Sequence, residues 1–414
     1  MSRRPRTTYF TGGDMRLVNV VKPTHICNLA CTYCYNDDVR KPVMAAETLG
    51  VTIRETLELA KQYESVDEVD FIWHGGEPLV AGREFFESIV SFQSEFASGV
   101  RFTNSVQTNG TLIDSRWAEF FAKEGFNVSL SLDGPEEIND RFRVYRSGAG
   151  SFAKTWKAIQ ALRAVGLNPG VCIVLSRATI DRTQEILRFL SDNHLGFNVI
   201  PLTLSGSARD HYDELSITPQ EYARAWISMY DEWIDAKDGY VYGHDFVVKT
   251  RAILYGKAAD CIGMSNCADF NLSVDPIGDV YPCASLSGNP AAKLGNIGDA
   301  PLVDIVNDER STTFRNRAVD PRCAECKWQH VCHGGCMSRA YKFTGNINSR
   351  DFYCPGLFEI YEHVAGRLAK HSIAPGTRNR WHMTDGLDPA LVPFKQTATK
   401  EPPRVIPIHS IREG

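Results

Sequence analysis

The sequence RLVNVVKPTHICNLACTYC occupies residues 16–34 and combines a β-rich run with a loop that carries three cysteines. Amphipathic segments follow, as at 47–63, where Leu49, Ile53 and Leu57 recur at the four-residue spacing of a helix. Five further β-rich runs alternate with such segments: DEVDFIWHG at 67–75, RFTNSVQTNG at 101–110, FNVSLSLDG at 126–134, NPGVCIVLS at 168–176 and GFNVIPL at 196–202. The six βα units predict an α/β fold whose parallel sheet is open or curled into a partial (β/α)6 barrel.

Polar motifs stand at the ends of the predicted strands. The cysteines follow the first strand, HGGEP (74–78) follows the second, QTNG (107–110) ends the third and SLDG (131–134) ends the fourth. Functional residues of parallel α/β proteins lie at the carboxyl ends of strands. We therefore expect these motifs to form one site.

Length and charge restrict the class of protein. The 414 residues predict two or three domains, since about 150 residues per domain is usual. The net charge of −5 offers no general attraction for nucleic acid. The chain has neither an apolar run long enough to span a membrane nor the apolar core of a secretory signal, so we expect a cytoplasmic protein with no nucleic-acid or membrane partner.

The changes in pattern along the chain predict five parts. These are an N-terminal extension (1–15), the α/β domain (16–235), a helical linker (236–260), a cysteine-rich domain (261–373) and an extended tail (374–414). A helix is expected from Pro219 to about 236, capped by Thr218. A closing helix is expected at about 357–372, and no helical periodicity is visible between 261 and that helix.

The twelve cysteines are unevenly distributed, and in a reducing cytosol such clusters favour metal binding or catalysis over disulfides. Cys27, Cys31 and Cys34 can hold three irons of a 4Fe-4S cluster and leave the fourth iron open to a ligand. The alternatives are a zinc site completed by His25 and three buried apolar thiols. Cys172, alone in a strand, is expected to be a buried structural thiol.

CNLACTYC resembles the C-x3-C-x2-C signature of radical S-adenosylmethionine (SAM) enzymes. The resemblance implies that the open iron binds the methionine part of SAM, whose cleavage yields a 5′-deoxyadenosyl radical. It implies that Gly75, Gly76 and Glu77 meet the amino group of SAM and that Tyr33 lies by the adenine. The weaker candidates for ribose and carboxylate contacts are Gln107, Asn109, Ser131, Asp133 and Arg143.

The later cysteines resemble the SPASM extension of radical SAM enzymes that modify peptides and proteins. The resemblance implies two auxiliary 4Fe-4S clusters, hence three in all. Cys261, Cys267, Cys283 and Cys336 would hold the cluster nearer the SAM site, and Cys323, Cys326, Cys332 and Cys354 the farther one. The alternative is a pair of zinc sites that staple a small domain.

The family resemblance implies a maturase that oxidises a side chain of a ribosomally made peptide or protein to form a crosslink or another C–X or C–C bond. One alternative is an anaerobic sulfatase maturase, which converts Cys or Ser to formylglycine. In those maturases an aspartate follows the third cysteine of the nearer cluster, whereas Ala284 follows Cys283 here, and this departure argues against aldehyde formation. An alternative of another class is a non-catalytic, zinc-stapled binding protein.

The partners implied are a peptide or protein substrate and an electron donor such as flavodoxin or ferredoxin. Fifteen residues precede the first predicted domain, too few to form a leader-recognition domain. Any leader peptide is therefore expected to be bound by the catalytic body, the tail or a separate leader-recognition protein.

Overall fold

A computed structural model describes residues 15–36, 42–63, 66–236, 241–258, 260–264 and 267–370. The predicted N-terminal extension, apart from Met15, and the predicted tail lie outside the described residues, as does part of the predicted linker. No helix in the described part of the chain is long and apolar enough to cross a membrane.

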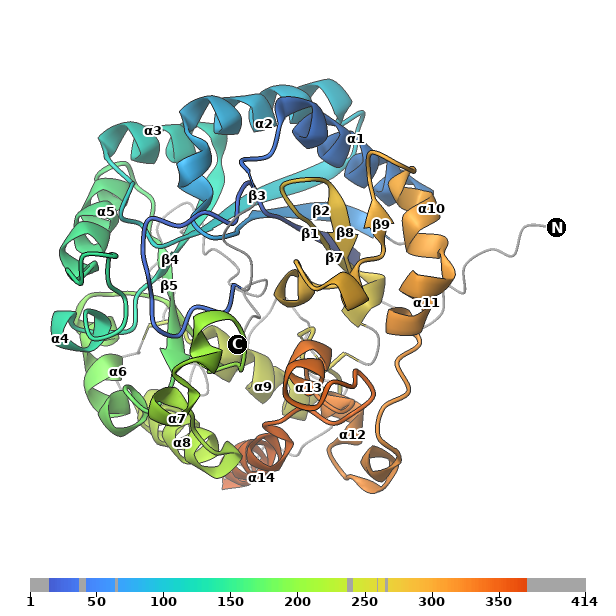
Figure 1. Ribbon diagram of the computed structural model, residues 1–414. Helices are drawn as coiled ribbons and strands as arrows, with labels where there is room; N and C mark the ends of the chain where they lie inside the picture. Colours follow the sequence, from blue (N-terminus) through green and yellow to red (C-terminus); the bar gives the residue numbers. More distant parts are fainter. Residues whose placement is uncertain are drawn as a thin grey trace.

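One nine-stranded sheet organises the molecule, in the order β6-β5-β4-β3-β2-β1-β7-β8-β9 (Figure 1). Its first six strands are all parallel and confirm the six predicted runs. They are β1 (Met15–Val21), β2 (Val66–Trp73), β3 (Arg101–Thr108), β4 (Phe126–Ser131), β5 (Gly170–Leu175) and β6 (Phe197–Pro201). The sheet curves, and helices surround it in Figure 1, so the predicted α/β fold with a parallel sheet is confirmed.

Helices cover the outer face of these strands. Leu49, Ile53 and Leu57 are fully buried, as their spacing predicts for one face of α1. The helices of this half are α1 (Ala46–Gln62), α2 (Arg83–Phe96), α3 (Ser115–Glu124), α4 (Glu136–Asn139), α5 (Phe152–Ala164), α6 (Thr183–Asp192), α7 (Tyr212–Leu215) and α8 (Pro219–Asp235). The predicted start of α8 is confirmed: Thr218 and Glu221 form a capping box and Pro219 is the first helical residue.

The cysteine-rich half shares the same sheet. β7 (Asn271–Val274) pairs in parallel with β1, and β8 (Asp279–Tyr281) and β9 (Gly295–Asn296) continue the sheet as antiparallel strands. α9 (His244–Tyr255) lies within the range predicted to be a helical linker and is almost wholly buried. α14 (Cys354–Lys370) confirms the predicted closing helix, which begins earlier than predicted, at Cys354.

The prediction of no helix between 261 and the closing helix is wrong. Four short helices lie there: α10 (Leu302–Asn307), α11 (Glu309–Arg315), α12 (Gln329–Cys332) and α13 (Met337–Thr344). None exceeds eight residues. A helix of two turns or fewer presents too few apolar repeats for a periodic pattern to be recognised.

Candidate active site

The carboxyl ends of β1, β2 and β3 lie side by side. Val21 is paired with Trp73, and Trp73 with Val106, so the segments that follow them leave the sheet at one level. The first of these segments leads to Cys27, the second is the HGGEP turn and the third ends at Asn109. The sequence prediction that these motifs come together is confirmed.

The HGGEP turn packs directly on the cysteine loop. The backbone N–H of Gly76 donates to the Thr24 carbonyl at 2.9 Å, and that of Glu77 donates to the Ile26 carbonyl at 2.9 Å. A Cβ atom on Gly76 would fall 2.4 Å from the His25 carbonyl oxygen, closer than side chains come. Glycine is therefore needed here so that two backbone segments can touch.

The Glu77 carboxylate forms hydrogen bonds with other residues of the protein. Its Oε1 accepts from the Leu79 backbone N–H at 3.1 Å and the Thr108 hydroxyl at 2.6 Å, and its Oε2 accepts from the Asn109 backbone N–H at 2.8 Å. The side chain is fully buried, and burial raises the pKa of its carboxyl to about 7 although these hydrogen bonds oppose the rise. The carboxylate thus ties the end of β2 to the end of β3.

A cavity of about 110 Å³ opens where these segments meet. Its walls include all three loop cysteines and seven of the nine residues predicted to bind SAM: Tyr33, Gly75, Gly76, Gln107, Asn109, Ser131 and Arg143. Glu77 and Asp133 are not among the residues that line it. These two residues lie behind the cavity wall and form hydrogen bonds with residues that line it.

Asp133 holds Tyr33. The Tyr33 hydroxyl donates to the Asp133 carboxylate and accepts from Arg143 Nη1 at 2.7 Å, while Asp133 Oδ1 accepts from the Val174 backbone N–H at 3.0 Å. All three side chains are at least nine-tenths buried. Burial raises the pKa of Tyr33 well above its usual value, so its hydroxyl stays protonated. A fixed aromatic ring at the cavity wall is the result.

Sequence reasoning missed several polar cavity residues, of which His74 and Tyr35 lie within hydrogen-bond distance of each other. The Gly75 backbone N–H points to His74 Nδ1 at 2.5 Å, and His74 Nε2 lies 3.3 Å from the Tyr35 hydroxyl. A neutral imidazole that accepts at Nδ1 carries its proton on Nε2, so His74 donates to Tyr35. The place of His74 directly after a strand was the signal that could have found it. Cys172, expected to be a buried thiol, is buried and lines this cavity too.

Two of the loop thiols, those of Cys27 and Cys31, are in an environment that disfavours the bare thiolate. Burial raises the pKa of Cys27 to about 12 and that of Cys31 to about 11. Metal ligation requires the thiolate, so iron binding here must displace protons. A set of three partly buried thiols at the wall of a cavity fits a cluster with one open iron better than a site closed by four protein ligands.

The later cysteines fall into two groups in space. Burial, then Cys261, Cys283 and Cys336, raise the pKa of Cys267, which identifies these thiols as its neighbours. Burial also raises the pKa of Cys354, where Cys323 and Cys326 contribute, and that of Cys332 to about 12, where Cys354 and Cys323 contribute. The grouping agrees with the two predicted ligand sets. Among the described residues no three His, Cys, Asp or Glu side chains are arranged around a single metal ion.

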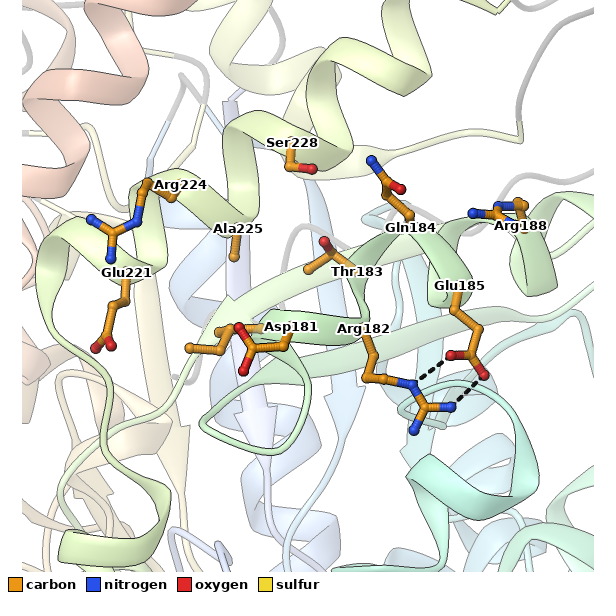
Figure 2. A pocket seen from close by; sticks show the side chains of 11 residues that line it. Asp181, Arg182, Thr183, Gln184, Glu185, Arg188, Glu221, Arg224, Ala225 and Ser228 are labelled. Atoms are coloured by element: carbon orange, nitrogen blue, oxygen red, sulfur yellow. Dashed lines mark hydrogen bonds and ion pairs between the residues drawn. The ribbon is translucent and has the colours of Figure 1, made fainter.

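A larger cavity of about 450 Å³ lies elsewhere, between the start of α6 and α8 (Figure 2). Its wall is charged, with Arg182 bound to Glu185 and with Arg188 and Arg224 at its sides. It contains no cysteine and none of the motifs at the strand ends. The smaller cavity is therefore the candidate active site.

Comparison with known families agrees with both halves of the chain. The radical SAM superfamily matches residues 21–190, and the SPASM iron-sulfur cluster-binding domain matches residues 261–327. The chain is 28% identical over 369 residues to a cysteine-type anaerobic sulfatase-maturating enzyme of Clostridium perfringens, covering 84% of this chain and 96% of that protein. It is 26% identical over 373 residues to a serine-type anaerobic sulfatase-maturating enzyme of Bacteroides thetaiotaomicron, covering 84% and 89%.

Solved structures show the same relationship. Native anSMEcpe with bound AdoMet and the Cp18Cys peptide superposes with a TM-score of 0.77 at 27% identity, covering 86% of this chain and 99% of that one. Streptococcus suis SuiB bound to its precursor peptide SuiA has a TM-score of 0.61 at 18% identity, covering 82% and 76%. The second match shows a shared fold.

Proposed function

We propose, for a chain that belongs to the radical SAM superfamily and carries a SPASM cluster-binding domain, that it oxidises a cysteine or serine side chain of a protein substrate to an aldehyde. The chain is a radical SAM maturase, an oxidoreductase that uses SAM and 4Fe-4S clusters and modifies a peptide or protein. The observation that carries the finer proposal is its similarity to both cysteine-type and serine-type sulfatase maturases along most of their lengths and its own.

The ligand assignment is part of the proposal. Cys27, Cys31 and Cys34 would hold the cluster that meets SAM, and the two later groups would hold one auxiliary cluster each. When bound, these groups supply a carbon-centred radical that takes a hydrogen atom from the substrate and an acceptor for one electron. In this proposal an electron donor such as flavodoxin or ferredoxin reduces the first cluster, and a separate leader-recognition protein would assist peptide binding.

The chain's own residues shape the cavity in which SAM and substrate would be bound and oriented. Gly75 and Gly76 keep the turn against the cysteine loop, and Tyr33 is held rigid at the wall by Asp133 and Arg143. His74 and Tyr35 present a hydrogen-bonded polar pair to the same cavity. We infer that the pair faces the substrate side, because Tyr35 follows Cys34 directly and no residue of the pair belongs to the predicted SAM set.

Ala284 is the feature that the aldehyde proposal must accommodate. Its side chain is buried in one apolar cluster with Val20 and Ile72, and a methyl group cannot accept the proton that leaves a thiol or hydroxyl during oxidation. Asp275 and Asp279 lie close in sequence but shape the β7–β8 turn, where Asp275 Oδ1 accepts from the Ile277 and Asp279 backbone N–H groups. The proton must therefore leave by another acceptor or to water.

The same residue favours a second candidate function. Formation of a crosslink or C–X bond in a ribosomally made peptide also begins with hydrogen abstraction and also ends with loss of one electron. Such a reaction does not need a carboxylate at position 284. Ala284 is the observation that supports this candidate against the sulfatase-type reaction.

One assay separates the two. Reduced protein and SAM are incubated with a Cys-type and a Ser-type sulfatase peptide, carbonyls are trapped with a hydrazine, and the peptide masses are read. Sulfatase-type activity predicts a trapped aldehyde at the target residue. Cleavage of SAM with no trapped aldehyde in either peptide would overturn the proposal in favour of the crosslinking candidate.

The variant Ala284→Asp tests the role of the position. It places a carboxylate directly after Cys283, and we expect faster aldehyde formation than in the unchanged protein. Ala284→Asn is the matched control, since it has nearly the same volume but accepts no proton at neutral pH. Equal rates of aldehyde formation in the two variants would show that a carboxylate at position 284 does not act as the base.

A further inference from the structure

Lys342 on α13 is linked by hydrogen bonds to the residue that follows the last loop cysteine. Its Nζ donates to the Ser205 hydroxyl oxygen at 2.5 Å, and that hydroxyl donates to the Tyr35 carbonyl at 2.5 Å. An ammonium group only donates, so Ser205 must accept from Lys342 and direct its own hydrogen to Tyr35. Ser205 is fully buried. The link therefore runs in one direction, from Lys342 to Tyr35, and contains a charge-assisted bond.

The turn at Ser205 and Gly206, which follows β6, lies directly against the cysteine loop. A Cβ atom on Gly206 would fall 2.3 Å from the Cys34 carbonyl oxygen and 2.8 Å from that of Asn36, closer than side chains come. Gly206 also has a φ of +54°, in the left-handed region that favours glycine. The turn thus touches the backbone on both sides of Tyr35 and holds it in place.

The ring of Tyr35 lies close to two ammonium groups. The Nζ atoms of Lys342 and Lys22 are 5.6 and 5.3 Å from its centroid, within the range in which an aromatic ring attracts a cation. The hydroxyl of the same ring lies 3.3 Å from His74 Nε2 at the cavity wall. Lys342 therefore acts on Tyr35 twice, through Ser205 and through the ring.

α13 is anchored on the group of cysteines assigned to the nearer cluster. The helix begins directly after Cys336. Its first residue, Met337, belongs to an apolar cluster against which Cys267 and Cys283 pack. Lys342 lies further along the same helix. The helix that borders the nearer group thus also carries the side chain that reaches the cavity wall.

Two further contacts hold the interface around Lys342. The Tyr353 hydroxyl donates at 2.7 Å to the carbonyl of Leu202, a residue of the cavity wall. The rings of Phe343 and Tyr212 are 6.3 Å apart in a T-shaped arrangement. Both contacts join the cysteine-rich half to the segment that follows β6. Lys342 therefore extends from a packed helix.

We propose that Lys342 is a positioning residue for peptide oxidation, which acts through Ser205 and the Tyr35 ring to fix the Tyr35 hydroxyl where the substrate meets it. Hydrogen transfer needs the reacting atoms about 3–3.5 Å apart, so a displaced Tyr35 would leave the peptide poorly placed while SAM is still cleaved. The inference rests on the substrate side given to Tyr35 under the proposed function. It gives the cysteine-rich half a part in placing the substrate.

The first test separates SAM cleavage from peptide oxidation in the full, iron-loaded chain. Lys342→Met removes the charge and nearly keeps the length of the side chain. Because a hydrogen bond from a charged donor is lost, we expect the KM for a Cys-type sulfatase peptide to rise about tenfold, with more 5′-deoxyadenosine formed per oxidised peptide. The KM for SAM should change less than about twofold. Lys342→Arg keeps the charge and should restore most of the loss.

Three variants make the result specific. Ser205→Ala removes the hydroxyl that joins Lys342 to Tyr35, and it also tests the link if Lys342→Met fails to load iron. The double variant should lose much less than the sum of the two single losses, because both changes break one link. Lys327→Met is the matched control: its ammonium lies 5.2 Å from the Trp328 ring in the same half, but its ion-pair partner is Glu362. Its KM for peptide should not change.

An unchanged KM and product ratio in Lys342→Met, or additive losses in the double variant, would contradict the link. Hydrogen exchange of residues 27–36 reads the link without turnover, and Lys342→Met should speed exchange there whereas Lys327→Met should not. Equal exchange in Lys342→Met and the unchanged protein would also overturn the link. Faster exchange in Lys342→Met, together with no aldehyde from the unchanged protein, would support the link and contradict the proposed function alone.

Discussion

The two cysteine-bearing regions are built in different ways. The loop from Cys27 to Cys34 leaves the end of a parallel strand, and backbone hydrogen bonds hold it on both sides, such as Ala30 N–H to the Val144 carbonyl at 2.7 Å and Thr32 N–H to the Phe142 carbonyl at 3.1 Å. Between Cys267 and Thr344, a stretch that the structure describes throughout, the longest helix has eight residues and the longest strand has four. Regular backbone structure is abundant around the first site and scarce around the other.

The difference indicates where the metal must contribute to folding. A site at the end of a sheet is positioned by hydrogen bonds and apolar packing that exist without iron. A region made of turns and short helices has fewer such bonds to hold its ligands, so cluster binding there supplies folding free energy. We therefore expect loss of iron to inactivate the first site and to unfold part of the second.

The largest effect is expected from changing Cys27, Cys31 and Cys34 together to Ala. About four of about twelve irons should be lost, and 5′-deoxyadenosine formation should cease, because in the proposed assignment the three clusters bind independently and only this one meets SAM. Unfolding of the barrel, followed by circular dichroism, should change little. Unchanged iron content would refute the loop-cluster assignment.

A smaller catalytic effect but a larger structural one is expected from Cys267→Ala or Cys326→Ala. SAM cleavage should persist while oxidised peptide falls strongly, since only completion of the oxidation needs the auxiliary clusters. Proteolysis should open the region beyond residue 261 before the barrel, because its ligands also fold it. Cys172→Ala, a buried cysteine outside all three groups, controls for the loss of one thiol in the iron count and in proteolysis, but not in turnover, because Cys172 lines the candidate active site. If soluble variants kept full turnover, the auxiliary clusters would not be needed to complete the oxidation.

The barrel site should respond to pH through Glu77 even without iron. Its pKa of about 7 in the folded protein exceeds the ordinary value of 4.5, so the stability it contributes is present below pH 4.5 and is lost as the pH rises through 7. The loss is on the order of 3 kcal/mol. Glu77→Gln should make the free energy of unfolding nearly independent of pH over this range, as measured by urea denaturation at several pH values. An identical pH dependence in both proteins would contradict the burial argument.

The smallest effect is expected at the cap of α8, a helix that carries none of the proposed cluster ligands. Thr218→Ala removes the capping box and should cost about 1 kcal/mol of unfolding free energy. Gln220→Ala, an exposed change in the same turn, should cost much less. The cost at Thr218 should be the same with and without iron, and an iron-dependent cost would show that the two regions do not differ as proposed.

The sequence predicted the barrel half better than the cysteine-rich half for a physical reason. Six strands bounded by turn residues, and a helix such as α1 with a repeated apolar face, leave periodic patterns that do not depend on distant partners. For the cysteine-rich half, the resemblance to SPASM enzymes implied two groups of four cysteines, and the thiols that raise one another's pKa in the folded chain divide in the same way. α10 to α13 are too short to leave such a pattern.

Burial of polar groups was not predictable in the same way. The HGGEP glycines, which were expected to admit a ligand, line the cavity, and they also admit the backbone of the cysteine loop, a contact that the sequence did not reveal. Glu77 does not line the cavity, and its carboxylate accepts hydrogen bonds from Thr108 and Asn109, so the contact with the amino group of SAM that the resemblance implies stays a prediction. The link from Lys342 to Tyr35 joins segments that lie far apart in the sequence. Such contacts appear only once the chain is folded.

Hydrogen transfer from substrate to SAM tests the central claim most directly. A sulfatase-type peptide carrying deuterium on the Cβ of its target cysteine is incubated with reduced protein and SAM, and the masses of 5′-deoxyadenosine and peptide are measured. A maturase that oxidises this side chain predicts deuterium in 5′-deoxyadenosine and an aldehyde in the peptide. Unlabelled 5′-deoxyadenosine together with an unchanged peptide would contradict it.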